Sequence, residues 1–138
     1  MRAGLQSYAQ LVDRGGVSTV RVDPQWAGGI TETLRIASHA RLRGLPIAVH
    51  DCGGPVQWAA SIHCCLHIPN AMILESVRAY YLEIYPTMAK NPPRVVADHA
   101  LPPGGAGHGV ELLPAYTERA TVRRATLRSG AFVSEAVQ

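Results

Sequence analysis

The sequence lacks any apolar run approaching the roughly 20 residues of a membrane-spanning helix, and its N-terminus has no apolar stretch of signal-peptide length. Its three cysteines, Cys52, Cys64 and Cys65, are an odd number, and two of them are adjacent, where a mutual disulfide is strained. These absences argue against a membrane protein and against a secreted protein held together by disulfides. We therefore expect a cytoplasmic protein with reduced cysteines.

Charge is also scarce, since 17% of the residues are charged and the formal net charge is only +3. The basic residues are scattered, apart from a cluster of arginines at 119, 123, 124 and 128 that has no interleaved aromatic residue. Because nucleic-acid binding combines a basic patch with stacking side chains or a recognition motif, we expect no nucleic-acid partner. A chain of 138 residues that is 47% hydrophobic is long enough for one domain with a core.

Helix and strand patterns alternate along the first half of the chain. Apolar residues recur at helical spacing over residues 5–14, 31–44 and 53–68, and short apolar or β-branched runs cover residues 17–23, 45–50 and 71–75. Thr31 is a candidate N-cap, Gly44 suits the left-handed position after a helix, and Pro55 suits a first helical turn. Short connections between these elements favour right-handed crossover units. The pattern predicts a parallel sheet in an α/β protein.

From residue 76 onward the pattern changes. We expect a helix that stops at Pro86, followed by a turn-rich segment with two short apolar runs at 95–97 and 110–113. This segment predicts a meander outside the sheet. The chain thus divides into residues 1–75, which carry the parallel sheet, and residues 76–138, which carry a terminal helix and meander.

Each of the three predicted strands ends in a polar residue, namely Asp23, His50 and Glu75. The carboxyl ends of parallel strands meet at one edge, where functional groups of α/β proteins gather. An imidazole oriented by a carboxylate suits general acid or base chemistry near neutral pH. We expect Asp23 to orient His50, and Glu75 to bind a substrate carboxylate if protonated or a hydroxyl if ionised.

Structural roles for the same residues remain open. Asp23 precedes Pro24, as turn residues often do, and Glu75 can form a salt bridge with Arg78 at the start of a helix. Other sites are weaker. A zinc set of His63, Cys64, Cys65 and His67 has no Cys-x-x-Cys pair, and adjacent helical residues point about 100° apart. The Gly-Gly pairs form no phosphate-binding motif, and no nucleophile elbow surrounds Cys52 or Ser61.

Four stretches resemble segments of the mandelate racemase and muconate lactonizing enzyme family, within the enolase superfamily. DPQWAGGITETLRIA resembles its sixth-strand segment, LPIAVH its seventh-strand histidine segment, AMILESVRAYY its eighth-strand glutamate segment, and PPGGAGHGVEL the Pro-Gly-x-Gly stretch that follows. The resemblance runs collinearly from Leu5 to Leu113. It implies the C-terminal part, about strands six to eight, of a (β/α)7β TIM-like barrel.

The resemblance also implies a chemistry, in which a base removes the proton α to a carboxylate and Mg²⁺ stabilises the resulting enediolate. His50 and Asp23 match the family's catalytic dyad, and Glu75 matches a glutamate that contacts the substrate carboxylate or enolic oxygens. Trp26, Asp51 and Cys52 lie in loops that border the substrate. The family's acidic Mg²⁺ ligands lie on strands three to five, so we expect no metal ligand within this chain.

The sequence around His50 and Glu75 looks most like the dehydratase members of the family. The intact enzyme would then be a Mg²⁺-dependent lyase acting on a sugar acid, and a homo-oligomer, with His50 also able to protonate the departing hydroxyl. Two alternatives remain. One is a racemase or cycloisomerase, that is, an isomerase of the same family. The other is a truncated, non-catalytic remnant, because a chain without the metal cannot offset the charge of the enediolate.

Overall fold

The computed structural model describes residues 4–118, 122–128 and 131–137. The first half of the chain contains, in order, α1 (Leu5–Asp13), β1 (Val20–Val22), α2 (Pro24–Ala27), α3 (Ile30–Leu42), β2 (Ile47–His50), α4 (Pro55–His67) and β3 (Ala71–Glu75). The alternation of helix and strand predicted from the sequence is confirmed. The short helix α2 was not predicted, and β1 begins three residues later than expected.

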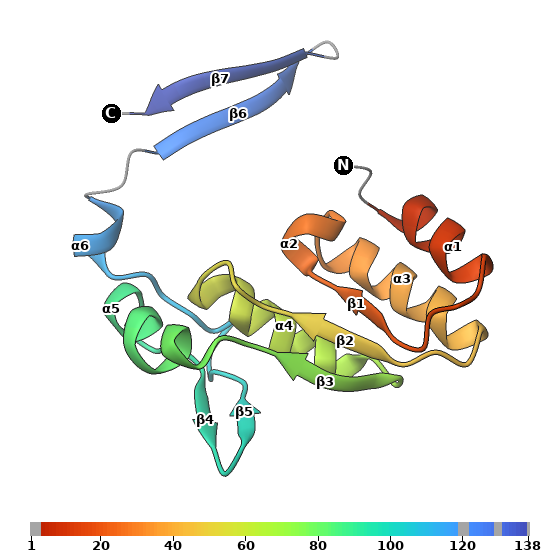
Figure 1. Cartoon of the computed structure of the whole chain (residues 1–138). Helices are drawn as coiled ribbons and strands as arrows, with labels where there is room; N and C mark the ends of the chain where they lie inside the picture. Colours follow the sequence, from red (N-terminus) through yellow and green to blue (C-terminus); the bar gives the residue numbers. More distant parts are fainter. Residues whose placement is uncertain (1–3, 119–121, 129–130, 138) are drawn as a thin grey trace.

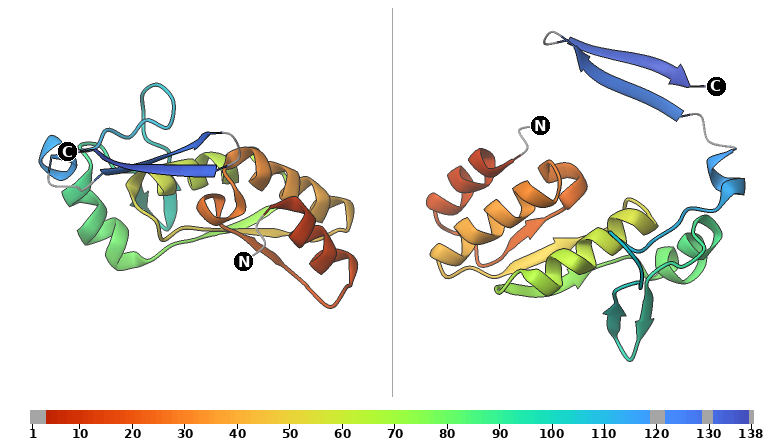
Figure 2. Two further views of the ribbon diagram at one scale, coloured as in Figure 1. Left: turned by 90° about the horizontal axis from the view of Figure 1, so that it is seen from above. Right: turned by 180° about the vertical axis from the view of Figure 1, so that it is seen from behind.

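The three strands form one parallel sheet in the order β1-β2-β3, which confirms the α/β prediction. Val22 pairs with Val49, and His50 pairs with Glu75, so the carboxyl ends of the strands lie level with one another. In the described part of the chain the helices that pack on the sheet, α1, α3 and α4, lie on one of its faces (Figures 1 and 2). The sheet therefore has one covered face and one open face.

The core lies between the covered face and the helices. β1 alternates buried, exposed and buried residues, because successive strand side chains point to opposite faces. Val22 and Val49 are 0% exposed and pack with Ile36 of α3, which is 1% exposed. Burial of each such side chain contributes about 1.5–3 kcal/mol before conformational entropy is subtracted, so this face supplies much of the stability.

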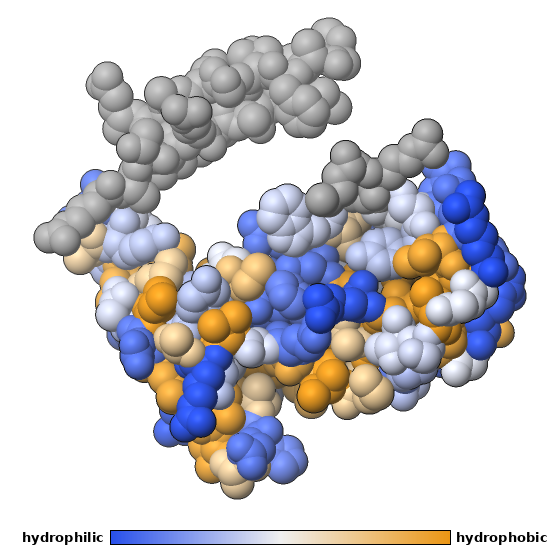
Figure 3. All heavy atoms as spheres, viewed as in Figure 1, coloured by the Kyte–Doolittle hydropathy of each residue, from blue (hydrophilic) through white to orange (hydrophobic). Residues whose placement is uncertain are grey.

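The open face is partly hydrophobic. Met72 and Ile73 of β3 are 60% and 54% exposed, and among the described strands β1 and β3 each have a neighbour on one side only. Figure 3 shows a hydrophilic patch over the middle of this face with hydrophobic surface around it. None of the described helices is both long and apolar enough to cross a membrane.

Two of the three predicted helix-end residues are confirmed, and one prediction was wrong. Gly44 has the left-handed φ of 69°, and Pro55 lies in the first turn of α4. Helix α3, however, begins at Ile30 with Gly29 as its N-cap and without a side-chain cap. Thr31 lies inside the helix, because Gly28 and Gly29 adopt positive φ values that turn the chain into α3 two residues earlier than a threonine cap would.

The helix after β3 does not stop at Pro86, which corrects the prediction. A π-helix (η1, Tyr80–Ile84) leads directly into α5 (Tyr85–Met88), and the N–H of Tyr85 donates to the carbonyl oxygen of Tyr80. Pro86 then falls in the first turn of α5, where its missing N–H is not needed. The wider π turn thus lets the helix continue through the proline.

The turn-rich segment contains more strand than expected. The run at 95–97 belongs to an antiparallel hairpin of β4 (Arg94–Val96) and β5 (His99–Leu101), and Leu112 in the second run forms a β-bridge with Ala89. After α6 (Pro114–Thr117), β6 (Val122–Arg128) and β7 (Ala131–Val137) pair as a second antiparallel hairpin, which the sequence analysis missed. Of the predicted basic cluster, Arg119 lies outside the described residues.

Candidate active site

Asp23 links the end of β1 to the start of α2. It is the N-cap of α2, and its Oδ1 accepts hydrogen bonds from the backbone N–H groups of Gln25, at 2.8 Å, and Trp26, at 3.3 Å. Its Oδ2 lies 2.9 Å from Nδ1 of His50. The two interpretations of Asp23, as a turn residue and as the partner of His50, are therefore both correct, because each carboxylate oxygen serves one of them.

His50 ends β2, and the structure brings its ring against Asp23 as the sequence predicted. Its side chain is 29% exposed, whereas that of Asp23 is only 9% exposed. Because the carboxylate faces Nδ1, this geometry favours the tautomer with its proton on Nδ1 and a free lone pair on Nε2. A lone pair held in place on a partly exposed ring is what a general base requires.

Gln57, in the first turn of α4, is a third member of this network that sequence reasoning missed. Its Nε2 donates to Asp23 Oδ1 at 2.8 Å. Its Oε1 lies over Gly53, where an added Cβ would be 1.7 Å from that oxygen, so a larger residue at position 53 would displace the Gln57 side chain. A polar residue two positions after the helix-starting Pro55 was the available signal, since a first helical turn that follows a strand points back toward the strand ends.

Glu75 lies beside His50, because the two residues are paired in the register of β2 and β3. Its carboxylate does not bind Arg78. It binds Arg21 of β1 through two contacts. Arg21 Nη2 donates to Glu75 Oε1 at 2.9 Å, and Arg21 Nε lies 2.6 Å from Glu75 Oε2. Arg21 was also missed, although strand alternation places residues 21 and 23 on the same face. Asp23, His50, Glu75 and Arg21 thus form a charged rim along the ends of three strands.

The three residues predicted to contact the substrate, Trp26, Asp51 and Cys52, differ in their exposure. Trp26 is 63% exposed, and Cys52 is exposed beside the dyad, so both are open to a ligand. Asp51 is 0% exposed, and its Oδ2 accepts a hydrogen bond from the Tyr85 hydroxyl at 3.0 Å. In this structure Asp51 therefore supports the loop from a buried position, and its role as a substrate contact stays a prediction. Nothing in the local sequence indicated Tyr85 as its partner.

Burial dominates the electrostatics of Asp51 and Tyr85. Desolvation raises the pKa of Asp51 from 3.8 to about 6, although the hydrogen bond from Tyr85 partly opposes the rise. Desolvation, together with the neighbouring Asp51, also raises the pKa of the Tyr85 hydroxyl. The hydroxyl in addition accepts a hydrogen bond from the N–H of Gly54 at 3.3 Å. The pair therefore joins the loop after β2 to α5.

The described residues do not make a site for Mg²⁺. Among them, the one cluster of three potential metal ligands is Asp23, His50 and Cys52, which offers one carboxylate together with nitrogen and sulfur. Mg²⁺ requires octahedral oxygen ligands, and the Glu75 carboxylate is already bound to Arg21. The described residues therefore offer Mg²⁺ no set of oxygen ligands.

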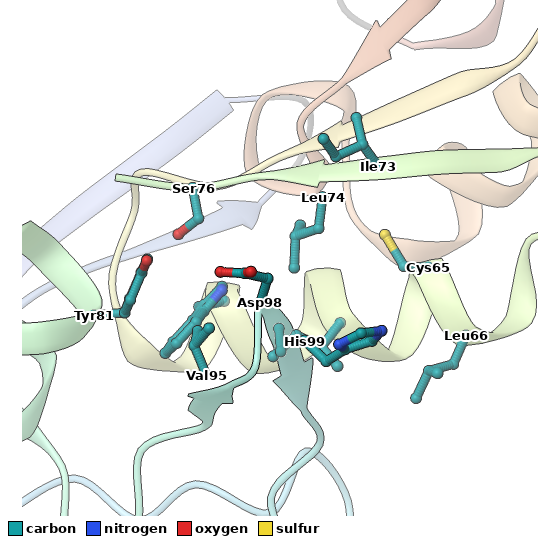
Figure 4. Close-up of a pocket in the computed structure, with 12 residues that line it drawn as sticks. Cys65, Leu66, Ile73, Leu74, Ser76, Tyr81, Val95, Asp98 and His99 are labelled. Atoms are coloured by element: carbon teal, nitrogen blue, oxygen red, sulfur yellow. The ribbon is translucent and has the colours of Figure 1, made fainter. Parts of the chain in front are cut away.

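A cavity of about 370 Å³ lies elsewhere, between β3, α4 and the β4–β5 hairpin. Figure 4 shows Ser76, Tyr81, Asp98 and His99 around it together with apolar side chains such as Leu74. Its lining contains none of Asp23, His50 or Glu75. The candidate acid–base groups thus lie on the open strand ends and not in this cavity.

The fold and the site define a class of protein, an α/β protein with acid–base groups at the carboxyl ends of adjacent parallel strands. Residues 1–116 match the model of the family described as "Enolase C-terminal domain-like". The chain therefore belongs to this family, in the mandelate racemase and muconate lactonizing enzyme branch of the enolase superfamily.

Similar proteins of known structure support the assignment. An enolase of the mandelate racemase subgroup from Agrobacterium tumefaciens is 37% identical, with a TM-score of 0.78 over 84% of this chain and 32% of its own. A mandelate racemase/muconate lactonizing enzyme from Jannaschia sp. CCS1 is 29% identical, with a TM-score of 0.75 over 89% of this chain and 31% of its own.

A curated relative is the D-galactonate dehydratase of Ralstonia pickettii, which is 35% identical over 68 residues, or 49% of this chain and 18% of the relative. The chain thus spans about a third of the length of the solved relatives and less than a fifth of the curated one.

Proposed function

We propose that this chain supplies the acid–base dyad of a sugar-acid dehydratase of the enolase superfamily, as strands six to eight of a (β/α)7β barrel. The observation that carries the proposal is the 2.9 Å contact between His50 Nδ1 and Asp23 Oδ2, with Glu75 in register on the next strand. The similarity to a D-galactonate dehydratase favours dehydration of a sugar acid over racemisation or cycloisomerisation.

His50 would accept the proton α to the substrate carboxylate at Nε2. Asp23, which accepts the Nδ1 proton, stabilises the imidazolium that forms and fixes the orientation of the ring. As the C–H bond breaks, its electron pair moves toward the carboxylate carbon. The β-hydroxyl then leaves, and the proton on Nε2 can pass to it, so that the substrate loses one molecule of water. His50 returns to its neutral form and is ready for another cycle.

Glu75 and Arg21 would set the polarity of the substrate subsite. Their two short contacts pair a guanidinium with a carboxyl group. Carboxyl oxygens accept hydrogen bonds, and we therefore assign Glu75 to a substrate hydroxyl. The exposed Trp26, whose backbone N–H bonds Asp23, and Cys52, which is exposed beside the dyad, would border the remainder of the ligand.

Members of this superfamily generally use Mg²⁺, and the described residues do not hold it. We propose that the metal ligands belong to the remainder of a barrel that pairs with the free edges of β1 and β3, and that the intact enzyme is a homo-oligomer. The exposed Met72 and Ile73 would be covered in such a barrel. The second candidate, a non-catalytic remnant, is favoured by the same missing ligands.

The test is exchange of the α-proton for deuterium, followed by NMR in D₂O with Mg²⁺ over a panel of sugar acids that includes D-galactonate and mandelate-like acids. The 138-residue chain is assayed alone and mixed with the N-terminal part of the Agrobacterium tumefaciens relative, which lacks its own copy of these strands. The matched variants are His50→Ala, which removes the base, and His39→Ala, which removes a histidine of α3 whose side chain is 22% exposed and contacts Asp13.

Exchange in the mixture that is lost with His50→Ala and retained with His39→Ala supports the proposal. We expect a loss of about 100-fold or more, as is typical when a general base is removed. Absence of exchange in the mixture, while a control mixture with the relative's own C-terminal part exchanges, would contradict the proposal and support the non-catalytic candidate.

A further inference from the structure

Cys52 brings a thiol to the acid–base dyad. The ligand atoms of Asp23, His50 and Cys52 all lie within 4.8 Å of one another, although the acid–base chemistry needs only the first two. Cys52 is exposed and free, whereas Cys64 is buried and Cys65 is partly buried. The three side chains combine carboxylate, imidazole and thiol, a donor set suited to metals of the zinc class.

We propose that Asp23, His50 and Cys52 bind a thiophilic divalent cation of the zinc class. On the proposed function, in which His50 is the base, this binding switches the base off. Three protein ligands leave a fourth tetrahedral position for water or a substrate oxygen. Mg²⁺ does not fit the same set, because it takes few nitrogen or sulfur ligands. The site is therefore distinct in chemistry from the Mg²⁺ site of the superfamily.

The geometry is close to what a tetrahedral ion needs. Metal–ligand distances of about 2.0–2.3 Å place tetrahedral ligand atoms roughly 3.3–3.7 Å apart. Asp23 Oδ2 and His50 Nδ1 are already 2.9 Å apart, and the outer limit of the cluster is 4.8 Å. Asp23 Oδ2 and His50 Nδ1 would move apart by about 0.4–0.8 Å, and Cys52 would move inward by at most about 1.5 Å. The exposed side chain of Cys52 is free to change rotamer.

Hydrogen bonds already hold the Asp23 carboxylate in place. Asp23 Oδ1 accepts three hydrogen bonds, from the N–H groups of Gln25 and Trp26 and from the amide of Gln57. These bonds hold the carboxylate while Oδ2 faces the histidine and has lone pairs for a cation. Hydrogen-bonded partners of this kind orient metal ligands, and their loss typically weakens binding about 10–100-fold.

Metal binding and base catalysis compete for the same atom. Cys52 gives up its thiol proton to solvent on coordination. If His50 binds through Nε2, the lone pair of the base is occupied. If it binds through Nδ1, the ring proton moves to Nε2 and the lone pair there is lost as well. Either mode removes the base without any change of fold.

The test uses Co²⁺ as an optical probe of the zinc site, titrated into the 138-residue chain under reducing conditions. A tetrahedral site with one thiolate shows d–d bands in the visible and a sulfur-to-cobalt charge-transfer band in the near ultraviolet. We expect one Co²⁺ per chain, displacement by an equivalent of Zn²⁺, and no displacement by excess Mg²⁺. No such bands, or displacement by Mg²⁺, would overturn the proposal.

The variants assign the ligands. Cys52→Ser, which alters an exposed side chain, is expected to abolish the charge-transfer band, and Gln57→Met to weaken Co²⁺ binding about tenfold. Cys65→Ser is the matched control, because its thiol lies in the cavity lining on α4 and its pKa is raised to about 11 by burial. A band that survives Cys52→Ser, or disappears with Cys65→Ser, would place the metal elsewhere and overturn the assignment. Far-ultraviolet circular dichroism of each variant verifies that the fold is retained.

Discussion

The two faces of the β1-β2-β3 sheet differ in what they contribute. The face covered by α1, α3 and α4 buries valines and isoleucines that are at most a few per cent exposed, and it holds no titratable group of the candidate site. The open face carries Arg21 and Glu75 and exposes Ile73. Stability and chemistry are thus separated by the alternation of side chains along each strand, and substitutions on the two faces are expected to have different consequences.

The largest effect on stability is expected from the covered face. Ile36→Ala removes a side chain that is 1% exposed and leaves a cavity against Val22 and Val49, with a loss of about 2–4 kcal/mol in the free energy of unfolding. Urea denaturation followed by circular dichroism measures it. Ile73→Ala on the open face is the matched control, with an expected change below about 0.5 kcal/mol. Equal losses for the two variants would show that the faces do not differ in this way.

The next effect is expected at the junction of the two faces. Asp23→Ala removes the acceptor of two backbone N–H groups and of the Gln57 amide, with an expected cost of about 2 kcal/mol from the lost N-cap and the unpaired donors. Asp13→Ala is the control, because Asp13 binds Arg43 on the exposed surface, and such pairs contribute about 1 kcal/mol or less. The comparison again uses urea denaturation, and a cost for Asp23→Ala no larger than that of the control would contradict the proposed anchoring.

A third effect depends on pH. The pKa of Asp51 is about 6 in the folded chain, raised by burial from 3.8, so between these values the folded state binds the proton more tightly than the unfolded state does. The stability contributed by protonated Asp51 is therefore fully present below about pH 4 and is lost as the pH rises through about 6.

The matching variant is Asp51→Asn, which keeps an acceptor for the Tyr85 hydroxyl but cannot ionise. We expect the stability difference between Asp51→Asn and the unmodified chain to shift in favour of the variant by about 2 kcal/mol or less between pH 4 and pH 7. Urea denaturation of both proteins across this range measures it. A difference that is independent of pH would show that Asp51 does not titrate as its burial requires.

The smallest effect is expected from the ion pair on the open face. The side chains of Arg21 and Glu75 are 66% and 33% exposed, so the solvent screens their attraction. A double-mutant cycle with Arg21→Met and Glu75→Gln should give a coupling of about 0.2–1 kcal/mol that decreases with added salt. A coupling of several kcal/mol, insensitive to salt, would mean that this face is desolvated in solution, for example by self-association.

Much of the sheet was predictable because its strands are short apolar runs between helical patterns, as buried parallel strands usually are. The predicted limits of β2 and β3 lie within two residues of the observed ones. The overlong prediction for β1 had a physical cause: residues 17–19 are rich in β-branched side chains, but β2 pairs only with residues 20–22. Strand propensity is local, whereas strand length depends on the partner.

The residues of the candidate site that end the strands were also predictable from the sequence. Asp23, His50 and Glu75 follow apolar runs, and parallel strands bring such positions to one edge. Gln57 could have been found from its place in the first turn after Pro55, whereas Tyr85 comes from a helix whose rotation and docking no local pattern encodes. The same limit applies to the passage of the helix through Pro86 and to the terminal β6–β7 hairpin. The roles of Trp26, Asp51 and Cys52 as substrate contacts, and the division at residue 75, stay predictions.

The sequence by itself determined the α/β alternation, the family and the polar residues at the strand ends, because these depend on periodicity and on short collinear motifs. Only the tertiary structure decided what those residues contact. It placed the Asp23 carboxylate between a helix cap, Gln57 and His50, turned Asp51 into the core, paired Glu75 with Arg21 and brought Cys52 beside the dyad. Hydrogen bonds and burial join residues far apart in the chain, and they depend on distances that form only when the helices pack on the sheet.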